Sequence, residues 1–194
     1  MANDLSKDEV MLAVTGALST APEGTKPAME PVNGLHQPLS TPWFNRGYVG
    51  EDGVNESVTK SVDVKVAWQN KTPLRRVTTE AGATYTFRLL QVNRENIELV
   101  RGAKISSDGT VTVDAGVEHE SFSWCIDIED KNRSIRKWLP SAVIEEIAEV
   151  TYQTEELVGW EITISADRFE FEDGTSGHFK ESYSDIEGEE PSMG

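Results

Sequence analysis

Histidines, cysteine and neighbouring carboxylates are the residues that could do chemistry in this sequence. The three histidines are His36, His119 and His178, and no two of them have the spacing of a helical or hairpin metal site. Zinc sites are built from several closely spaced histidine, cysteine or carboxylate ligands, and no cysteine pair accompanies these histidines. The sequence therefore predicts no zinc-type metal site, and we expect each histidine at the surface.

Nucleophile and acid-base motifs are equally weak. Cys125 is the only cysteine, and its alternating surroundings favour a small, half-buried strand residue. Glu118 and Glu120 flank His119 and would face the same side of a strand, where charge on a solvated face is the ordinary explanation. An acid-base hydrolase needs two converging carboxylates, at least one of them partly buried. We expect no catalysis and no cofactor.

One basic loop is set in an acidic chain. Lys71, Arg75 and Arg76 cluster in a protein with 34 acidic and 18 basic residues and a formal net charge of −16. The loop is either simply solvated or meets an acidic patch on a neighbouring copy, since head-to-tail contacts join two different surfaces of one chain. Net negative charge argues against nucleic-acid binding, which needs clustered Lys and Arg.

The composition also indicates the compartment in which the protein is made. A single cysteine permits no intrachain disulfide, which favours a reducing compartment. No apolar run approaches the roughly 20 residues that a membrane-spanning helix needs. The first residues carry mixed charge and lack the basic and apolar regions of a secretory signal. We expect a protein made in the cytoplasm without membrane association.

Composition shifts divide the chain into three parts. Residues 1–42 are rich in proline and glycine and predict an extended N-terminal arm, with a strand at 10–19 suggested by alternation. Residues 43–183 predict a β-rich domain. Residues 184–194 are small and acidic, which is typical of a disordered tail.

Alternation of apolar and polar residues predicts most of the strands. The clearest alternating segments are 62–68, 85–89, 122–128 and 160–166, and a further strand is expected at 135–139. Turn signals predict a tight turn at Asp52-Gly53, a loop at 69–76, and a hairpin whose strands 104–106 and 110–114 flank residues 107–109. A last hairpin is predicted around Asp173-Gly174.

One short helix is predicted at 94–101. Asn93 can cap its start and Gly102 its end, while Asn96 is a weak partner for a capping box, so the start should fray. Residues 141–152 fit a helix nearly as well as a strand, and we favour the strand. The residues alone thus predict a mainly β domain with one short helix across it.

Four segments in the same order resemble the major tail proteins of long-tailed, siphovirus-type bacteriophages, in particular those of actinobacteria. They are 13–16 with 21–25, 47–54, 84–91 with 93–96, and 138–140 with 149–152. The departures are Gly50, where the family usually has serine, the polar stretch 114–121, and the acidic tail in place of an added immunoglobulin-like domain. The resemblance also supports a strand at 141–152.

The resemblance implies a structural virion protein. Family members fold as two packed antiparallel sheets, a sandwich or barrel, with a flanking helix. Six copies form a ring whose inner strands join into one barrel, and rings stack through loops and the N-terminal arm. The resulting tail tube surrounds the tape-measure protein, meets the tail terminator and distal tail proteins, and lets DNA pass without specific binding.

The resemblance also suggests candidate site residues. The loop 69–76 would mediate stacking between rings, with Lys71, Arg75 and Arg76 as contacts. An acidic lumen would repel the phosphates of DNA, which would explain the negative net charge of the chain. The candidates for lumen-facing residues are Asp63, Lys65, Thr84, Thr86 and Arg88.

A second class of function remains open. A soluble, monomeric β-sandwich that binds carbohydrate or another cell-surface ligand would explain the five tryptophans, provided that their rings are exposed and coplanar. Most of them fall on apolar faces or at strand ends, which favours a role in the core.

Overall fold

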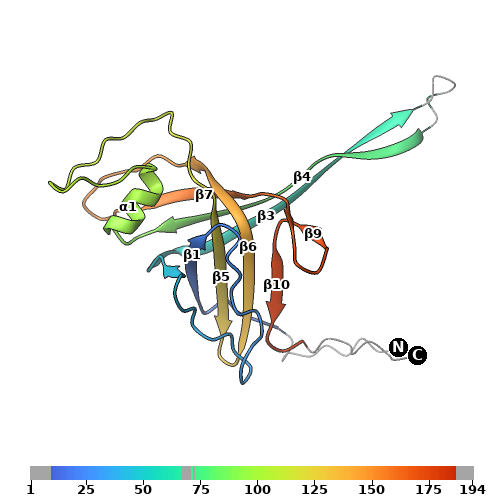
Figure 1. The fold of residues 1–194 in the computed structure, drawn as a ribbon, viewed down its shortest axis with the longest axis horizontal. Coiled ribbons are helices and arrows are strands. Elements are labelled where there is room, and N and C mark those ends of the chain that lie inside the picture. Colours follow the sequence, from blue (N-terminus) through green and yellow to red (C-terminus); the bar gives the residue numbers. More distant parts are fainter. Residues whose placement is uncertain (1–9, 67–70, 72, 187–194) are drawn as a thin grey trace.

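The computed structural model describes residues 10–66, 71 and 73–186. Strands dominate the described chain (Figure 1). The elements are β1 (Thr15–Pro22), β2 (Phe44–Asn45), β3 (Val49–Val66), β4 (Pro73–Leu89), α1 (Arg94–Arg101), β5 (Phe122–Asp130), β6 (Arg133–Ile147), β7 (Trp160–Ala166), β8 (Phe169–Glu170), β9 (Ser176–Gly177) and β10 (Lys180–Tyr183). The predicted mainly β fold with a single short helix is confirmed within these residues.

Strand β6 bends one antiparallel sheet into two layers. The strand order is β2-β1-β5-β6-β7-β4-β3, with β10 also on β6. The first part of β6, up to Ala142, pairs with β5, whereas the part from Ala142 to Ile147 pairs with β7. Two strands, β6 and β7, lie between β4 and β5 in the sheet, yet the ring centroids of Phe87 on β4 and Trp124 on β5 lie 5.4 Å apart. The two halves of the sheet therefore pack face to face.

The core comes from the apolar side of the alternating strands. Tyr85, Phe87 and Leu89 of β4 are buried, and Ile162 and Ile164 of β7 lie beside them. Side chains two residues apart share a face of a strand, so the period read from the sequence translates directly into this buried surface. The aromatic pairs add directional contacts to the apolar burial.

Helix α1 packs at the end of the two layers. The side chain of Asn93 accepts a hydrogen bond from the backbone N–H of Asn96, and Gly102 closes the helix in the left-handed conformation. Leu99 and Val100 are buried against the core. Asn96 is not a frayed position but is fully buried, and its Nδ2 donates to the carbonyls of Arg46 and Gln91. This side chain ties the start of the helix to the sheet.

A buried ion pair fastens the N-terminal arm to the sheet. Arg136 of β6 is fully buried, and its Nε and Nη2 donate to the two carboxylate oxygens of Asp127 at 2.6 and 2.7 Å. Its Nη1 and Nη2 also donate to the backbone carbonyls of Ala28 and Gln37 at 2.7 and 2.8 Å. The guanidinium thus satisfies backbone carbonyls of the irregular segment 28–37, which lacks the hydrogen bonds of a regular strand or helix.

A buried histidine holds the same segment. The Nδ1 of His36 lies 2.8 Å from Ser134 Oγ, and its Nε2 lies 3.1 Å from the carbonyl of Met29 and 3.0 Å from Ser182 Oγ. The prediction that His36 lies at the surface is wrong, because the arm folds back and covers it. Since a carbonyl only accepts, the bond to Met29 requires a proton on Nε2, which fits the neutral ring.

The stability of the protein should depend on pH through His36. Burial first, and then the charge of Arg136, lowers the pKa of His36 from its ordinary value, although the Met29 carbonyl and Asp127 oppose this shift. The unfolded chain therefore binds a proton that the folded chain resists, so the free energy of unfolding should fall as pH drops below about 6.5. Between pH 7.5 and 5.5, the free energy of unfolding measured in urea should fall less for His36→Gln than for the parent. A His119→Gln control should show the same pH dependence of the free energy of unfolding as the parent. Equal pH dependence in all three proteins would contradict the assignment of this effect to His36.

Several local predictions are corrected by the structure. The first strand is Thr15–Pro22 and not 10–19, because residues 15–22 are the ones opposite β5. The predicted turn at Asp52-Gly53 is an irregularity within β3, where the register shifts between Val49 and Val54. The strand at 141–152 is present only to Ile147.

The hairpin predicted around residues 107–109 has a turn but no strands. Ser106 donates to the carbonyl of Thr110 at 2.8 Å, yet 104–106 and 110–114 form no ladder. The last hairpin is confirmed as β8 and β9, whose Phe169 and neighbouring Phe171 pack on Trp138. Of the predicted strand 62–68 and tail 184–194, residues 67–68 and 187–194 lie outside the described residues.

Candidate assembly surfaces

The layer made by β3, β4, β7 and the end of β6 has a polar face opposite the core. Thr84 lies opposite Ser165, and Thr86 lies opposite Thr163, in the pairing of β4 with β7. The Oγ1 atoms of Thr86 and Thr163 are 2.9 Å apart, so their side chains share one face. Because Tyr85 and its alternating neighbours are buried, this face points away from the core.

Strand β3 extends this face with further uncharged residues. Asn55 lies opposite Thr86, and Ser57 lies opposite Thr84. The hydroxyl face is defined here as Asn55, Ser57, Thr84, Thr86, Thr163 and Ser165. Thr84 and Thr86 thus share this face, with partners from two other strands.

Arg88 stands at one end of the hydroxyl face and is engaged by its own chain. It lies opposite Glu161 in the strand pairing, and its Nη2 donates to the carbonyl of Leu157 at 2.6 Å. Arg88 therefore fixes the connection between β6 and β7, residues 148–159, in addition to sharing the face of Thr84 and Thr86.

Both edges of this layer are unpaired in the part of the chain that the structure describes. Strand β3 ends the sheet on one side. On the other side, the pairing of β5 with β6 stops at Ala142, so residues 143–147 of β6 pair only with β7. Open strand edges present free N–H and C=O groups that another strand can bind. The layer is therefore suited to extension by a second chain on either side.

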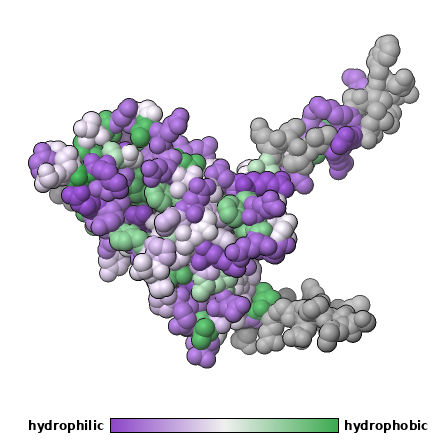
Figure 2. Space-filling view, viewed as in Figure 1, coloured by the Kyte–Doolittle hydropathy of each residue, from purple (hydrophilic) through white to green (hydrophobic). Residues whose placement is uncertain are grey.

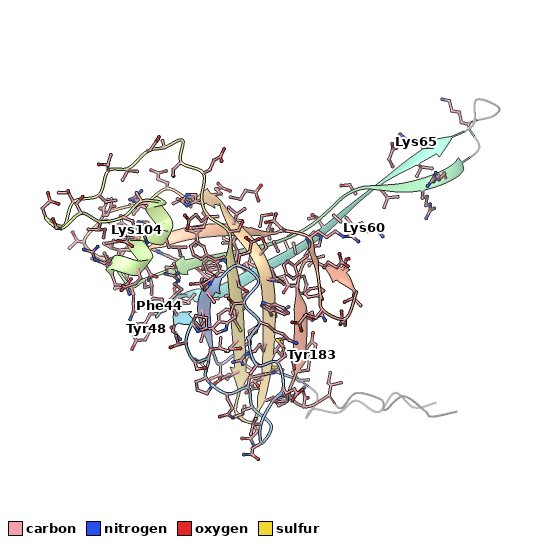
Figure 3. The ribbon with its side chains drawn as sticks, in the orientation of Figure 1. Phe44, Tyr48, Lys60, Lys65, Lys104 and Tyr183 are labelled. Atoms are coloured by element: carbon pink, nitrogen blue, oxygen red, sulfur yellow. The ribbon has the colours of Figure 1, made fainter. Side chains whose placement is uncertain are left out.

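The outer parts of β3 and β4 form a hairpin arm that leaves the body. The pairing of β4 with β7 ends at Ala83, and the arm, defined as residues 60–66 and 73–82, continues with two strands alone. Figure 2 shows it standing clear of the body, and Figure 3 places Lys60 nearer the body than Lys65. Two-stranded ribbons are only marginally stable in water, which favours a partner for the arm.

The predicted stacking residues lie on this arm. Lys71 precedes β4, while Arg75 and Arg76 are strand residues of β4, so the loop predicted at 69–76 is shorter than expected. Residues 69, 70 and 72 of that loop lie outside the described residues. All three basic side chains are exposed.

Asp63 and Lys65 lie apart from the hydroxyl face. Both belong to the arm part of β3, where Lys65 Nζ forms an ion pair with a carboxylate oxygen of Asp63. The structure therefore separates the five suggested lumen residues into two groups. Thr84, Thr86 and Arg88 share the face over the body, and the other two lie on the arm.

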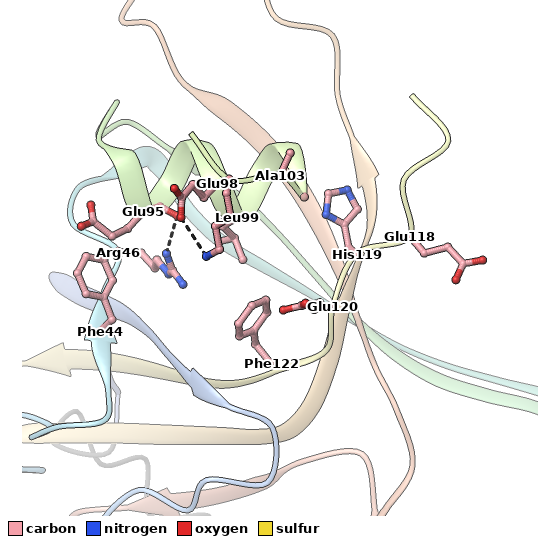
Figure 4. Close-up of a pocket in the computed structure, with 12 residues that line it drawn as sticks. Phe44, Arg46, Glu95, Glu98, Leu99, Ala103, Glu118, His119, Glu120 and Phe122 are labelled. Carbon is pink, nitrogen blue, oxygen red and sulfur yellow. Dashed lines mark hydrogen bonds and ion pairs between the residues drawn. The ribbon is translucent and has the colours of Figure 1, made fainter. Parts of the chain in front are cut away.

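A cavity of about 350 Å³ opens beside α1 (Figure 4). Two of its charged side chains, Arg46 and Glu98, are engaged within the chain. Arg46 is buried and donates from Nη1 to the carbonyl of Glu95 at 3.1 Å, and burial lowers the pKa of its guanidinium to about 10. Glu98 pairs with Arg94 and Lys104 at 3.1 and 3.0 Å.

Glu118 and Glu120 beside this cavity do not form a converging pair. Glu118 and Glu120 belong to an irregular segment before β5, so the strand that would place them on one side is absent. Figure 4 shows the carboxylate of Glu118 pointing away from that of Glu120. Within the described residues, no three His, Cys, Asp or Glu side chains are grouped as metal ligands.

The tryptophans that the structure describes do not form an exposed binding platform, since Trp43 is half-buried and the other three are buried. Trp124, Trp138 and Trp160 are buried in or beside the core. Trp68 lies outside the described residues. None of the described helices is long and apolar enough to cross a membrane.

Sequence reasoning missed four of the six residues of the hydroxyl face, namely Asn55, Ser57, Thr163 and Ser165. Asn55 and Ser57 flank Glu56 and lack an apolar alternation, whereas Thr163 and Ser165 alternate with apolar residues of β7. The signal that could have found the two residues of β7 is the polar half of the same alternation that located the core. The two free edges required the order of strands and had no signal in the local sequence.

Comparison with known proteins agrees with this architecture. No curated protein matches the chain. A family model described as "Phage tail tube protein" matches residues 2–173. Since this match covers most of the 194 residues, the chain belongs to the phage tail tube protein family.

Proposed function

We propose that this chain forms rings of six copies that stack into the tube of a phage tail, a structural role without catalysis. The observation that carries the proposal is a four-strand layer with two free edges in a member of the tail tube family. Within one ring, the β3 edge of each copy would pair with residues 143–147 of β6 in the next copy. Six copies follow from the resemblance to major tail proteins.

Strand directions support this edge contact. Each neighbouring pair in the order β6-β7-β4-β3 is antiparallel, so β3 runs opposite to β6. In the proposed ring, a rotation about an axis along the strands relates each copy to the next, and this rotation leaves the strand directions unchanged. Strand β3 of one copy would therefore meet β6 of the next in the antiparallel sense that the rest of the sheet already uses. Ring closure would leave no edge exposed.

The dimensions suit a conduit. Six such layers contribute roughly 24 strands, and a spacing of about 4.8 Å gives a circumference of about 115 Å before strand tilt widens it. Barrels of 16 to 18 strands already enclose an aqueous channel. The hydroxyl face would line the channel, because the opposite face of the layer is occupied by the core. DNA would pass over hydroxyl and amide groups that offer phosphates no cationic site.

The hydroxyl face modifies the expected lumen chemistry. None of its six members is acidic, so the repulsive lining predicted from the net charge would have to come from residues at its ends, such as Glu161 beside Arg88. The tape-measure protein would occupy the channel before DNA, and the tail terminator and distal tail proteins would meet the two ends of the tube. These partners are part of the proposal.

Electron microscopy of the purified protein tests the ring and the tube. We expect negative-stain images at high concentration to show rings or tubes with a central channel, and mass photometry of dilute samples to show the ring mass or its dissociation to monomers. Monomers that persist at high concentration and do not elongate tail-tip seeds would contradict the proposal.

A further inference from the structure

The hairpin arm carries apolar side chains that its own chain does not cover. Val58 beside the arm is 63% exposed, and Val62 and Val64 on it are 47% and 41% exposed. Lys60, Val62, Val64 and Arg76 line one shallow concave surface. An apolar strip of this kind, framed by cations on a projecting ribbon, is typical of a contact surface.

Three cations at the outer end of the arm and beside it are also unpaired. Among the described residues, no ion pair involves Lys71, Arg75 or Arg76, whereas Lys104 and Lys137 on the body each pair with glutamate. The arm therefore offers both an apolar strip and uncompensated positive charge to another surface.

The connection between β6 and β7 has the complementary properties. Residues 148–159 contain Glu149, Glu155 and Glu156 but no lysine or arginine. Tyr152 and Leu157 of the same connection are 69% and 70% exposed. Arg88 binds the carbonyl of Leu157, so the connection is held at the end of β4 as a defined surface.

The arm and this connection lie at opposite ends of one molecule. The register places Trp160, which follows the connection, opposite Leu89 at the end of β4, whereas Arg75 lies near its start. Fourteen residues of extended strand separate Arg75 from Leu89, which corresponds to about 45 Å. Figure 1 shows the arm and α1 at opposite ends. The two surfaces can therefore meet only between copies.

We propose that the arm of one copy docks on the β6–β7 connection of a copy in the adjacent ring. Arg75 and Arg76 would face Glu149, Glu155 and Glu156, and the arm valines would cover Tyr152 and Leu157. This inference rests on the proposed tube and assigns the surface that receives the arm. The contact joins two different surfaces along the strand direction, so it repeats without closing, as a filament of rings requires.

Site-specific cross-linking between two variants tests the contact. Arg75→Cys and Glu156→Cys proteins, one of them carrying a mass tag, are mixed, assembled and treated with a short bismaleimide. We expect cross-linked heterodimers in assembled samples at several times the yield in unassembled ones. Native Cys125 should not interfere, because it is buried and burial raises the pKa of its thiol. Arg75→Cys mixed with Glu30→Cys, another exposed glutamate, is the matched control.

Charge reversal supplies a second readout. Arg75→Glu should raise the protein concentration needed for tube growth by at least about tenfold, since like charges at a contact cost several kcal/mol. Adding Glu156→Lys to the Arg75→Glu protein should restore growth. Arg168→Glu makes the same charge change at another exposed position and should leave growth unchanged. Unchanged circular dichroism would show that each variant is folded.

The outcomes separate the inference from the proposed function. Tubes that form normally with Arg75→Glu, without cross-links from Glu156→Cys above the control, would overturn this docking surface and leave the tube proposal standing. Absence of any assembled species from the parent protein, with or without seeds, would overturn both. Rescue by the double reversal would support the docking surface directly.

Discussion

Replacing residues 61–80 with an Asn-Gly turn is expected to abolish tube growth while leaving a folded subunit. Lys60 and Ala81 lie opposite each other in the pairing of β3 with β4, so a two-residue turn can join them without changing the register. The core lies in the body and does not include the arm. The free energy of unfolding should stay within about 1 kcal/mol of the parent, as for other surface changes.

Electron microscopy and urea unfolding measure the two halves of this prediction. The remaining part of β3 keeps its free edge, so single rings can still close, and mass photometry should find the ring mass without longer species. Exchange of the exposed turn 107–109 for another short turn is the control, because it shortens no contact surface named above. Normal tubes from the arm replacement would exclude the arm as the link between rings.

Arg136→Met is expected to lower the free energy of unfolding by about 3–5 kcal/mol, the usual cost of removing one member of a buried ion pair. The substitution leaves Asp127 without its partner and frees the carbonyls of Ala28 and Gln37. Chemical unfolding measures the loss, and limited proteolysis should cut the segment around residues 28–37 faster than in the parent.

Two further variants separate charge from geometry. Arg136→Lys keeps the charge but cannot reproduce the planar set of four bonds, so it should recover only part of the stability. Asp127→Asn combined with Arg136→Met should cost less than the sum of the single changes, because neither partner is then left charged and buried. If Arg136→Met lowers the free energy of unfolding by less than about 1 kcal/mol, the ion pair is not needed to hold the N-terminal arm.

Elements defined by a local period were predictable from the sequence. The strands around Phe87 and Ile162 alternate apolar and polar residues, and the burial follows that alternation, whereas β5 around Trp124 is buried on both faces. Helix α1 carries its own start and stop residues, Asn93 and Gly102. In each case the information lies within about ten consecutive residues, which is the range over which a pattern can be read.

Features made by distant segments were not predictable in this way. Arg136 stands beside Lys137 and reads as a solvated residue, but the N-terminal arm, more than 90 positions earlier, covers it. His36 is buried by the same fold-back. The Asp52-Gly53 pair is a good turn signal, yet the hydrogen bonds of β3 with β4 continue past it, since the long pairing outweighs one local preference.

The candidate assembly surfaces were also only partly predictable from the sequence. Thr84 and Thr86 were found because they alternate with buried aromatic residues. Their neighbours Asn55 and Thr163 required knowledge of which strands pair. The start of β4 was read as a loop because Arg75 and Arg76 interrupt the apolar pattern, whereas the alternation at Val62 and Val64 predicted the other strand of the arm.

Strand β6 has a mechanical consequence. It is hydrogen-bonded to β5 and β10 along its first part and to β7 along its second, so it belongs to both layers. Tension applied to one layer therefore reaches the other through the covalent backbone of β6, and the layers cannot slide past each other as two separate sheets could. A chain of such subunits would respond to bending as a series of stiff blocks, with the compliance located at the joints between them.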